Sequence, residues 1–491
     1  MRKEAQQGGV IHVARDAHRL QAMRAALDFF APELPVFHFP AWDCLPFDRV
    51  SPNADISAQR MSSLASFVAQ MPKSYVVLTT LSAASQRVPA RATVEAAVFR
   101  ASVHSRVDEQ ALRAFLVRMG FVQTPTVMEP GDYSIRGGII DIFPPGLSEP
   151  IRLDFFGDTL DGIRQFDPAT QRTVKSLETV DLSSVSEVIL DEASIRRFRQ
   201  NYRIEFGAAG TDDPLYEAIS AGRKHQGVEH WLPFFHDQMD TLFDYLPDAT
   251  VILDDQSTPA RLARWDTIAD QYDARKTAFT QKGRLDTVYK PAPPELLYLN
   301  DAAWQDALAE RRQVALSVLP QPTGLNALDA GARLGRNFAP ERQNEALSLF
   351  GAVSDHIKKM GATKPVVITS YSSGARERLS GLLQDEGHGE LREIHNVKDL
   401  RGAGTYLAVS QLEHGFETED LIVITEQDIL GDRLVRSTKK RKRADNFLTE
   451  TQSLSPGDLV VHVDHGVGRF KALEIISAAG ADHECLLPAY A

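Results

Sequence analysis

The chain has 491 residues, of which 43 % are hydrophobic and 24 % are charged. It is longer than one hydrophobic core usually organises, so we expect about three folded units. The formal net charge is −12, so the chain as a whole should be repelled by phosphate backbones and any contact with DNA must be local. No apolar run approaches the ~20 residues that span a bilayer, and the N-terminus lacks the apolar core of a signal peptide. We therefore expect a globular, cytoplasmic protein.

The residues that carry common enzymatic or metal chemistry are not in the required patterns. Cys44 and Cys485 are too few for a disulfide framework and lack the paired spacing of a zinc site. None of the 14 histidines forms a ligand pair on one helix face, and neither a phosphate loop nor a nucleophile elbow occurs. Asp254 and Asp255 follow an apolar strand as magnesium-binding acids do, but an ordinary strand that ends in solvated acids is favoured. We predict no catalytic residue, no metal site and no cofactor.

The first part of the chain alternates strands and helices. Residues 9–40 predict strand, helix and strand, and residues 56–80 predict a further helix and strand, which indicates a parallel sheet covered by helices. The intervening loop, WDCLPFDRVSPNAD, places Trp42 and Phe47 where they need not belong to the core. Such loops often carry function, although as often they only cap the fold.

The spacing of hydrophobic residues changes after a helix predicted at residues 108–119. From Thr126 to Val174 short extended runs (IIDIF, IRLDFF, GIRQF) are separated by turn residues, which is typical of a small antiparallel unit. We predict that residues 98–183 are a β-rich domain inserted into the first α/β domain, which comprises residues 1–97 and 184–335.

A second, smaller α/β domain is predicted over residues 340–432. It contains a helix over RQNEALSLFGAVSDHIKKM, the strand PVVITS, the helix GARERLSGLLQDEG, and the strands TYLAVS and LIVIT. The sequence Ser372-Ser373-Gly374 predicts a helix N-terminus, and a plain cap is favoured over an anion site.

The last part of the chain joins a basic linker to a partial barrel. The run KKRKR at 439–443 lies in a linker over 433–454 and is either solvated or, less readily, a phosphate-binding patch. After it, GDLVVHVDHGVGRFKALEII begins a β-barrel pattern over 455–491. A small barrel usually needs about five strands, so we expect a truncated barrel.

Surface recognition is the function that remains, and its candidates lie in the β-rich domain. Arg136 precedes Gly137-Gly138 at one end of a predicted strand, and Arg152 alternates with apolar neighbours, so it should point away from the buried face. Arginines beside an aromatic such as Phe156 are typical interface hot spots. The residues alone leave open a second interpretation, solvated arginines and a core Phe156.

Four segments resemble one bacterial family. The run MEPGDYSIRGGIIDIFPPGLSEPIRLDFFGDTLDGIRQFDPATQRT resembles the UvrA-binding domain that UvrB shares with the transcription-repair coupling factors. The segments FPAWDCLPFDRVSPNADISAQR and HGFETEDLIVITEQDILGDR resemble the first and third domains of the coupling factors. The segment GDLVVHVDHGVGRF is similar to the start of their RNA polymerase-interacting domain, a module also found in CarD-type regulators.

The resemblance implies a fold and a function in transcription-coupled nucleotide-excision repair. It implies a degenerate helicase-like first domain, a Tudor/SH3-like barrel at the end, and recruitment of UvrA to RNA polymerase stalled at DNA damage. The UvrA contact falls on Arg136, Arg152 and Phe156, and the polymerase contact falls near the glycine-rich opening of the barrel and on Ile476.

The family's ATP-dependent DNA translocase motor, with its ATP, magnesium and DNA sites, has no counterpart in this sequence. We therefore expect that this chain does not hydrolyse ATP by itself. The alternatives are a fragment of a UvrB-like DNA-repair ATPase and a CarD-like regulator that binds RNA polymerase.

Overall fold

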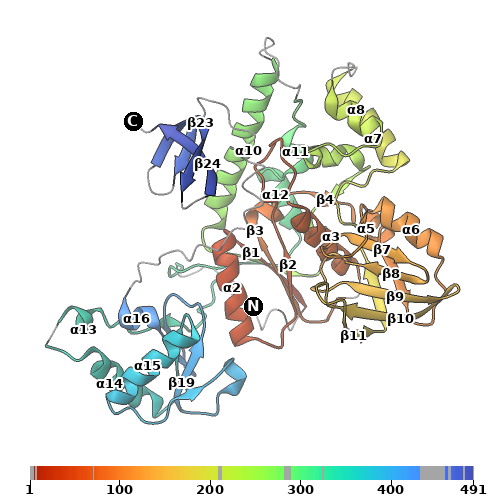
Figure 1. Ribbon diagram of the computed structural model, residues 1–491. Coiled ribbons are helices and arrows are strands. Elements are labelled where there is room, and N and C mark those ends of the chain that lie inside the picture. Colours follow the sequence, from red (N-terminus) through yellow and green to blue (C-terminus); the bar gives the residue numbers. More distant parts are fainter. Residues whose placement is uncertain are drawn as a thin grey trace. The chain divides into compact units, whose positions relative to one another are not determined.

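The structure is a computed structural model that divides into two compact units, residues 1–429 and 430–491 (Figure 1). It describes residues 5, 8–69, 71–207, 213–280, 289–322, 326–344, 346–431, 459–462, 466–478 and 481–489. It contains both parallel and antiparallel sheets, as the strand patterns predict. Within the described ranges no helix is long and apolar enough to cross a membrane.

The first sheet is parallel throughout and has the strand order β15-β14-β1-β3-β2. Its strands are β1 (Gly9–Ala14), β2 (Val36–Phe39), β3 (Tyr75–Thr80), β14 (Thr250–Leu253) and β15 (Gln313–Ala315). Helices α2 (Ala17–Phe30) and α3 (Ala54–Val68) connect the first three strands, which confirms the predicted alternation. Segments far apart in the sequence therefore build one sheet.

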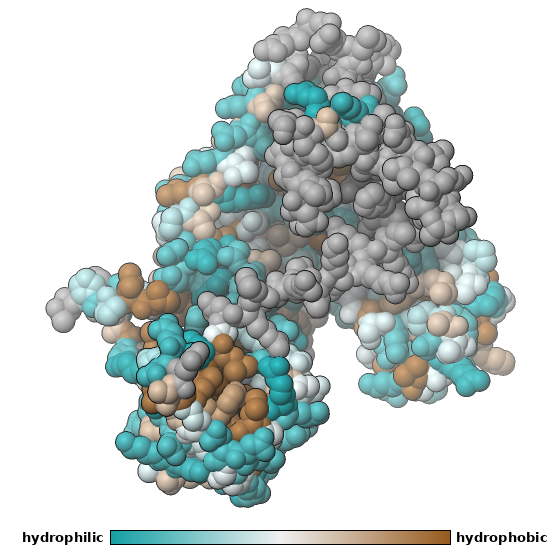
Figure 2. All heavy atoms as spheres, turned by 60° about the vertical axis from the view of Figure 1, so that its left-hand side comes forward, coloured by the Kyte–Doolittle hydropathy of each residue, from teal (hydrophilic) through white to brown (hydrophobic). Residues whose placement is uncertain are grey.

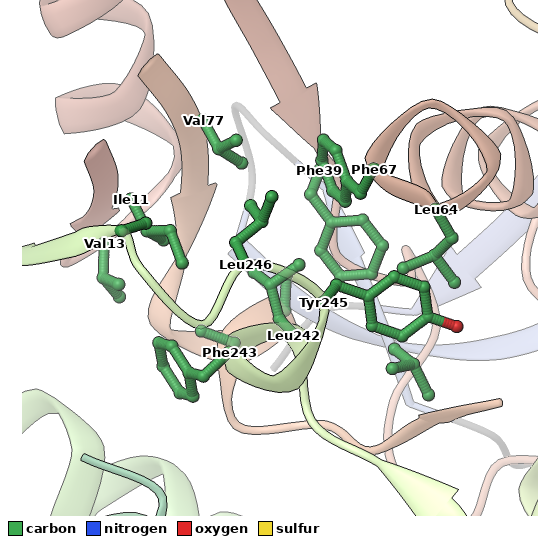
Figure 3. Close-up of a cluster of buried hydrophobic side chains, with 14 of the residues drawn as sticks. Ile11, Val13, Phe39, Leu64, Phe67, Val77, Leu242, Phe243, Tyr245 and Leu246 are labelled. Atoms are coloured by element: carbon green, nitrogen blue, oxygen red, sulfur yellow. The ribbon is translucent and has the colours of Figure 1, made fainter. Parts of the chain in front are cut away.

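Successive side chains of β1 point to opposite faces of the sheet and so contribute to two hydrophobic cores. Val10 and Ala14 pack with α2 on one face, and Ile11 and Val13 pack on the other face with α3 and with α9 (Leu242–Tyr245). Figure 3 shows side chains of β1, β2, β3, α3 and α9 converging in this second cluster. A central strand buried on both faces needs apolar residues at nearly every position, which explains the run VIHVA.

An antiparallel insert interrupts this α/β arrangement. Strand β5 (Phe99–Ser102) pairs with β12 (Thr179–Leu182), so the chain enters and leaves the insert side by side. Between them lie α6 (Glu109–Arg118) and a sheet in the order β11-β10-β9-β8-β7-β6, whose only parallel pair in the described chain is β6 with β7. Those strands are β6 (Val122–Gln123), β7 (Asp132–Arg136), β8 (Ile139–Ile142), β9 (Ile151–Phe156), β10 (Thr159–Phe166) and β11 (Thr173–Leu177).

One face of the insert's sheet is closed by α6. Asp108 caps this helix by accepting hydrogen bonds from the backbone N–H groups of Gln110 and Ala111. Its apolar stripe, Leu112, Phe115 and Leu116, packs against inward-facing residues of β7 to β10. The opposite face of the sheet is left uncovered by this helix.

A buried ion pair ties the segment after the insert to the first sheet's helix α3. Arg60 of α3 and Glu187 have no exposed side-chain surface, and the Arg60 Nη2 lies 3.1 Å from the Glu187 Oε1. Arg60 also donates to the Pro40 carbonyl at 2.8 Å, and the Trp42 indole N–H donates to Glu187 at 2.6 Å. Buried charges are tolerated only when they are paired and hydrogen-bonded in this way.

The expectation that Phe47 need not be core is wrong. Its ring is fully buried in an aromatic cluster with Phe198, Trp231 and Tyr298, and its φ of 57° lies in the left-handed region. Trp42 is half-buried, and its indole N–H donates to Glu187. The loop is therefore folded onto residues that follow 180 in the sequence, and it caps the core.

The remaining elements of the α/β part are mostly helices. They are α4 (Leu81–Ala84), α5 (Arg91–Ala96), α7 (Glu192–Phe206), α8 (Pro214–Ser220), η1 (Val228–Phe235), α10 (Ser257–Thr280), α11 (Pro294–Leu297) and α12 (Asp301–Leu308), with β4 (Val88–Pro89) paired to β13 (Met239–Asp240).

Another sheet of the first unit is mixed and has the order β16-β20-β21-β17-β19-β18. Its strands are β16 (Arg333–Leu334), β17 (Pro365–Ser370), β18 (Arg392–Glu393), β19 (Gly404–Val409), β20 (Phe416–Glu417) and β21 (Ile422–Thr425), accompanied by α13 (Ala339–Gln343), α14 (Leu349–Gly361), α15 (Ser373–Asp385), η2 (Val397–Asp399) and α16 (Glu426–Leu430). The predicted strands PVVITS, TYLAVS and LIVIT are confirmed.

The single helix predicted over RQNEALSLFGAVSDHIKKM is wrong. Helix α13 ends at Gln343, and α14 begins only at Leu349 because the Ser348 hydroxyl caps it by accepting from the Gly351 N–H at 3.0 Å. On this α/β part, Figure 2 shows hydrophobic side chains gathered and ringed by hydrophilic ones. Exposed large hydrophobic side chains here include Leu334, Leu347 and Val409.

The second unit contains an antiparallel sheet in the order β22-β23-β24. Its strands are β22 (Leu459–His462), β23 (Gly466–Ala478) and β24 (Ala481–Ala489). The backbone of Ile476 pairs with His483, and the Ile476 side chain lies outside what the structure describes. The basic run at 439–443 also lies outside the described residues. The truncated barrel stays a prediction.

The Arg60–Glu187 pair predicts a large loss of stability when one partner is removed. Arg60→Ala leaves the Glu187 carboxylate buried without its cation and should lower the free energy of unfolding by about 3–5 kcal/mol. Urea titration followed by tryptophan fluorescence measures this, with Trp42 as a local reporter. As a control, Arg24→Ala at the exposed Arg24–Asp28 pair should change stability by less than about 1 kcal/mol. Equal effects of the two variants would contradict the role given to the buried pair.

Candidate functional site

Two tight turns bring the candidate residues to one end of the insert's sheet. Arg136 is the last residue of β7 and Phe156 is the last residue of β9. The two-residue turns that follow need left-handed backbone, which Gly137 (φ 60°) and Gly157 (φ 63°) supply. Since β7 and β9 run in the same direction, both residues reach the same end of the sheet.

The strand register places a row of polar residues on the face that α6 leaves uncovered. On β8, Asp141 lies opposite Ser134 of β7 and Arg152 of β9, and Arg152 lies opposite Arg164 of β10. The residues that alternate with them, such as Leu153, are buried in the insert's core. The prediction that Arg152 points away from the buried face is confirmed.

Asp141 holds both candidate arginines. Its side chain has no exposed surface, and its Oδ2 accepts from the Arg136 Nη2 at 2.6 Å. Arg152 donates from Nε to Oδ1 at 2.7 Å and from Nη2 to Oδ2 at 2.9 Å, a forked arrangement. We call Arg136, Asp141 and Arg152 the arginine cluster.

Arg152 is further confined by its neighbours. Its guanidinium carbon lies 4.7 Å from the centre of the Phe166 ring, and its Nη2 lies 3.5 Å from the Gln171 Oε1. The hydrogen bonds that Arg152 donates to Asp141 raise the pKa of Arg152 above its ordinary value. Its side chain is only 21 % exposed, whereas that of Arg136 is 53 % exposed. The interpretation of two freely solvated arginines is therefore wrong for Arg152.

Phe156 is not a core residue. It is 84 % exposed, so the interpretation of a core Phe156 is wrong as well. It lies on the same face of the sheet as Arg152, four residues further along β9. An exposed ring near a positively charged cluster can bind a protein surface that offers a carboxylate and an apolar pocket.

Sequence reasoning missed Asp141, Phe166 and Gln171. Asp141 is a lone acid among isoleucines in IIDIF, and a hairpin register that places it opposite Arg152 could have identified it. Gln171 has a φ of 59°, and no sequence pattern predicts this left-handed conformation.

Asp254, the acid at the end of β14 that was compared with a magnesium ligand, is paired with an arginine. The Asp254 side chain is 1 % exposed and accepts from the Arg19 Nε at 3.0 Å and Nη2 at 2.9 Å. Burial is the largest single influence and acts to raise the pKa of Asp254, but the hydrogen bonds and charge of Arg19 together with the backbone N–H groups of Asp255 and Arg15 lower that pKa below its ordinary value. The expectation that both acids are solvated is wrong for Asp254.

Two minor candidates behave as ordinary structural residues. The Ser372 hydroxyl accepts from the Ala375 N–H at 3.2 Å, so the helix N-terminus predicted at Ser372 is confirmed. Burial, followed by nearby carboxylates, raises the pKa of the Cys44 thiol to about 12, which disfavours the reactive thiolate.

Three family models match separate parts of the chain. Residues 99–187 match the UvrB interaction domain, residues 360–429 match the MFD D3 domain, and residues 454–491 match the CarD-like/TRCF RID domain. The arginine cluster and Phe156 lie within the first match. The antiparallel insert thus lies within the part of the chain that is similar to the UvrB interaction domain.

Curated relatives extend the similarity to the whole chain. It is 29 % identical to the transcription-repair-coupling factor of Rickettsia conorii over 490 residues, covering 100 % of this chain and 42 % of that protein. It is 30 % identical to that of Escherichia coli over 500 residues, covering 99 % and 42 %. For Bacillus subtilis the identity is 22 % over 507 residues, covering 96 % and 40 %.

These matches make the chain a relative of the transcription-repair-coupling factors, and it corresponds to an N-terminal portion of them. The chain spans about two fifths of the length of these relatives.

The cluster geometry predicts that two site residues differ in their contribution to stability. Arg152→Ala removes two of the three hydrogen bonds to the buried Asp141 and should lower the free energy of unfolding by about 1–3 kcal/mol. Phe156→Ala removes an exposed ring and should change it by less than about 0.5 kcal/mol. Scanning calorimetry measures both variants against the unmodified chain. A larger loss from Phe156→Ala than from Arg152→Ala would contradict the described packing.

Proposed function

We propose that this chain recruits UvrA to RNA polymerase stalled at DNA damage, as part of transcription-coupled nucleotide-excision repair in the cytoplasm. The observation that carries the proposal is the arginine cluster beside the exposed Phe156, on the uncovered face of the domain that matches the UvrB interaction domain. Arg136, Arg152 and Phe156 are the proposed UvrA contacts.

The chemistry of the cluster supports an acidic partner surface. Two guanidinium groups share one carboxylate, so one positive charge remains uncompensated within the cluster. Within the described part of the chain, Arg136 uses only its Nη2 for a protein acceptor, which leaves its other N–H groups for a partner. Guanidinium groups make forked, charge-assisted bonds to carboxylates, and an exposed aromatic supplies rigid apolar area beside them.

The second unit supports a contact with RNA polymerase. Its match to the CarD-like/TRCF RID domain leads us to propose that the glycine-rich opening near β23, with Ile476, contacts the polymerase. We propose a Tudor/SH3-like barrel for the complete form of this unit, and a degenerate helicase-like ancestry for the parallel sheet.

Domain limits at 1–97 with 184–335, 98–183, 340–432 and 455–491, with a linker over 433–454, belong to the same proposal. DNA translocation would require a motor, ATP and magnesium that we assign to other parts of full-length family members.

The first test concerns the UvrA contact. Arg136→Ala should weaken UvrA binding by about 2 kcal/mol, roughly thirtyfold, if it is a hot-spot residue. Folding should be kept because Arg152 still pairs with Asp141. Titration calorimetry with purified UvrA measures the affinity. Arg100→Ala is the matched control, since Arg100 forms an exposed pair with Asp181 in a different sheet. Unchanged affinity in a folded Arg136→Ala variant would refute the site.

The second test concerns ATP. We expect no ATP turnover by this chain, with or without DNA, because the sequence has no phosphate loop and Arg19 occupies the Asp254 carboxylate. Phosphate release by the purified chain measures this. DNA-stimulated turnover that survives repurification would favour the alternative of a UvrB-like ATPase.

A further inference from the structure

We propose that Asp141 is a positioning residue for UvrA recognition, acting only through the two arginines that it holds. The inference rests on the proposed function of the same site. Asp141 has no exposed side-chain surface, so it cannot touch a partner while the cluster is intact. Its effect on binding must pass through Arg136 and Arg152.

The register explains why one carboxylate reaches both arginines. Asp141 lies on β8 between β7 and β9, directly opposite Arg152 on one side and Ser134 on the other. Ser134 is small, and Arg136 follows it by two residues on the same face, so the arginine can extend diagonally to Asp141. A carboxylate on the middle strand is thus within reach of both neighbours.

The ordering of Arg136 is the main contribution expected from Asp141. Arg136 precedes a glycine turn and is half exposed, and a free arginine side chain loses rotamer freedom when a partner immobilises it. The 2.6 Å bond from its Nη2 to the Asp141 Oδ2 fixes the guanidinium before the partner arrives. Arg152 is fixed more completely by its forked pair, the Phe166 ring and Gln171.

Asp141→Asn keeps the shape of the side chain, removes its charge and turns one acceptor into a donor. It should weaken UvrA binding about tenfold, within the range measured for residues that share one hydrogen-bond network. Asp154→Asn is the matched control, because Asp154 pairs with Arg164 on the same face and should leave the affinity nearly unchanged.

Double variants separate positioning from a general structural role. If Asp141 acts through the arginines, Asp141→Asn combined with Arg136→Ala should weaken binding by less than the product of the single effects. Combined with Phe156→Ala, which has no described contact to Asp141, the effects should multiply. Sub-additivity with both partners or with neither would overturn the inference.

A second variant decides the matter if Asp141→Asn does not fold. Arg152→Lys keeps a cation beside Asp141 but cannot form the forked pair, so it should lose nearly as much UvrA affinity as Arg152→Ala. Wild-type affinity in Arg152→Lys would overturn the inference while leaving the proposed function supported by the effect of Arg136→Ala. An unmodified chain that does not bind UvrA would overturn both.

Discussion

The buried pair of Arg60 and Glu187 is the interaction on which the first unit depends. It sits where the chain returns from the antiparallel insert to the α/β part, and it joins α3, the Pro40–Trp42 segment and the returning chain through one guanidinium and one carboxylate. A charge without exposed surface is tolerated only with its partner in place. The segment that returns from the insert is thereby fixed to the part of the chain that precedes the insert, and the later strands β14 and β15 complete the sheet of β1 to β3.

Three buried carboxylates are each paired with a guanidinium group, and the consequence of the pairing differs among them. Glu187, Asp254 and Asp141 each have at most 1 % exposed side-chain surface, and each accepts bonds from a guanidinium. At Glu187 the cation is buried too, so the pair is purely structural. At Asp254 both carboxylate oxygens accept from Arg19, so the acid is already paired within the fold. Only at Asp141 are there two arginines for one acid, which leaves positive charge facing outward.

Local patterns predicted the elements, and long-range packing decided the residues that prediction missed. The strand and helix alternation of the first sheet and the hairpins of the insert follow from apolar periodicity and turn glycines, which are properties of neighbouring residues. The burial of Phe47 depends on Phe198 and Trp231, and the pairing of Asp254 depends on Arg19. Asp141 was missed because its meaning comes from strand register, which the spacing of side chains within one strand does not contain.

The pairing of β5 with β12 has a consequence for how such a protein can change over time. Neighbouring strands lie about 4.8 Å apart, so the two junctions of the insert are separated by little more than the length of one residue. An inserted domain attached in this way can be exchanged between unrelated proteins, or replaced by a short turn, with little disturbance to the inserted domain or to the domain that carries it. Recognition and scaffold can thus diverge independently within one chain.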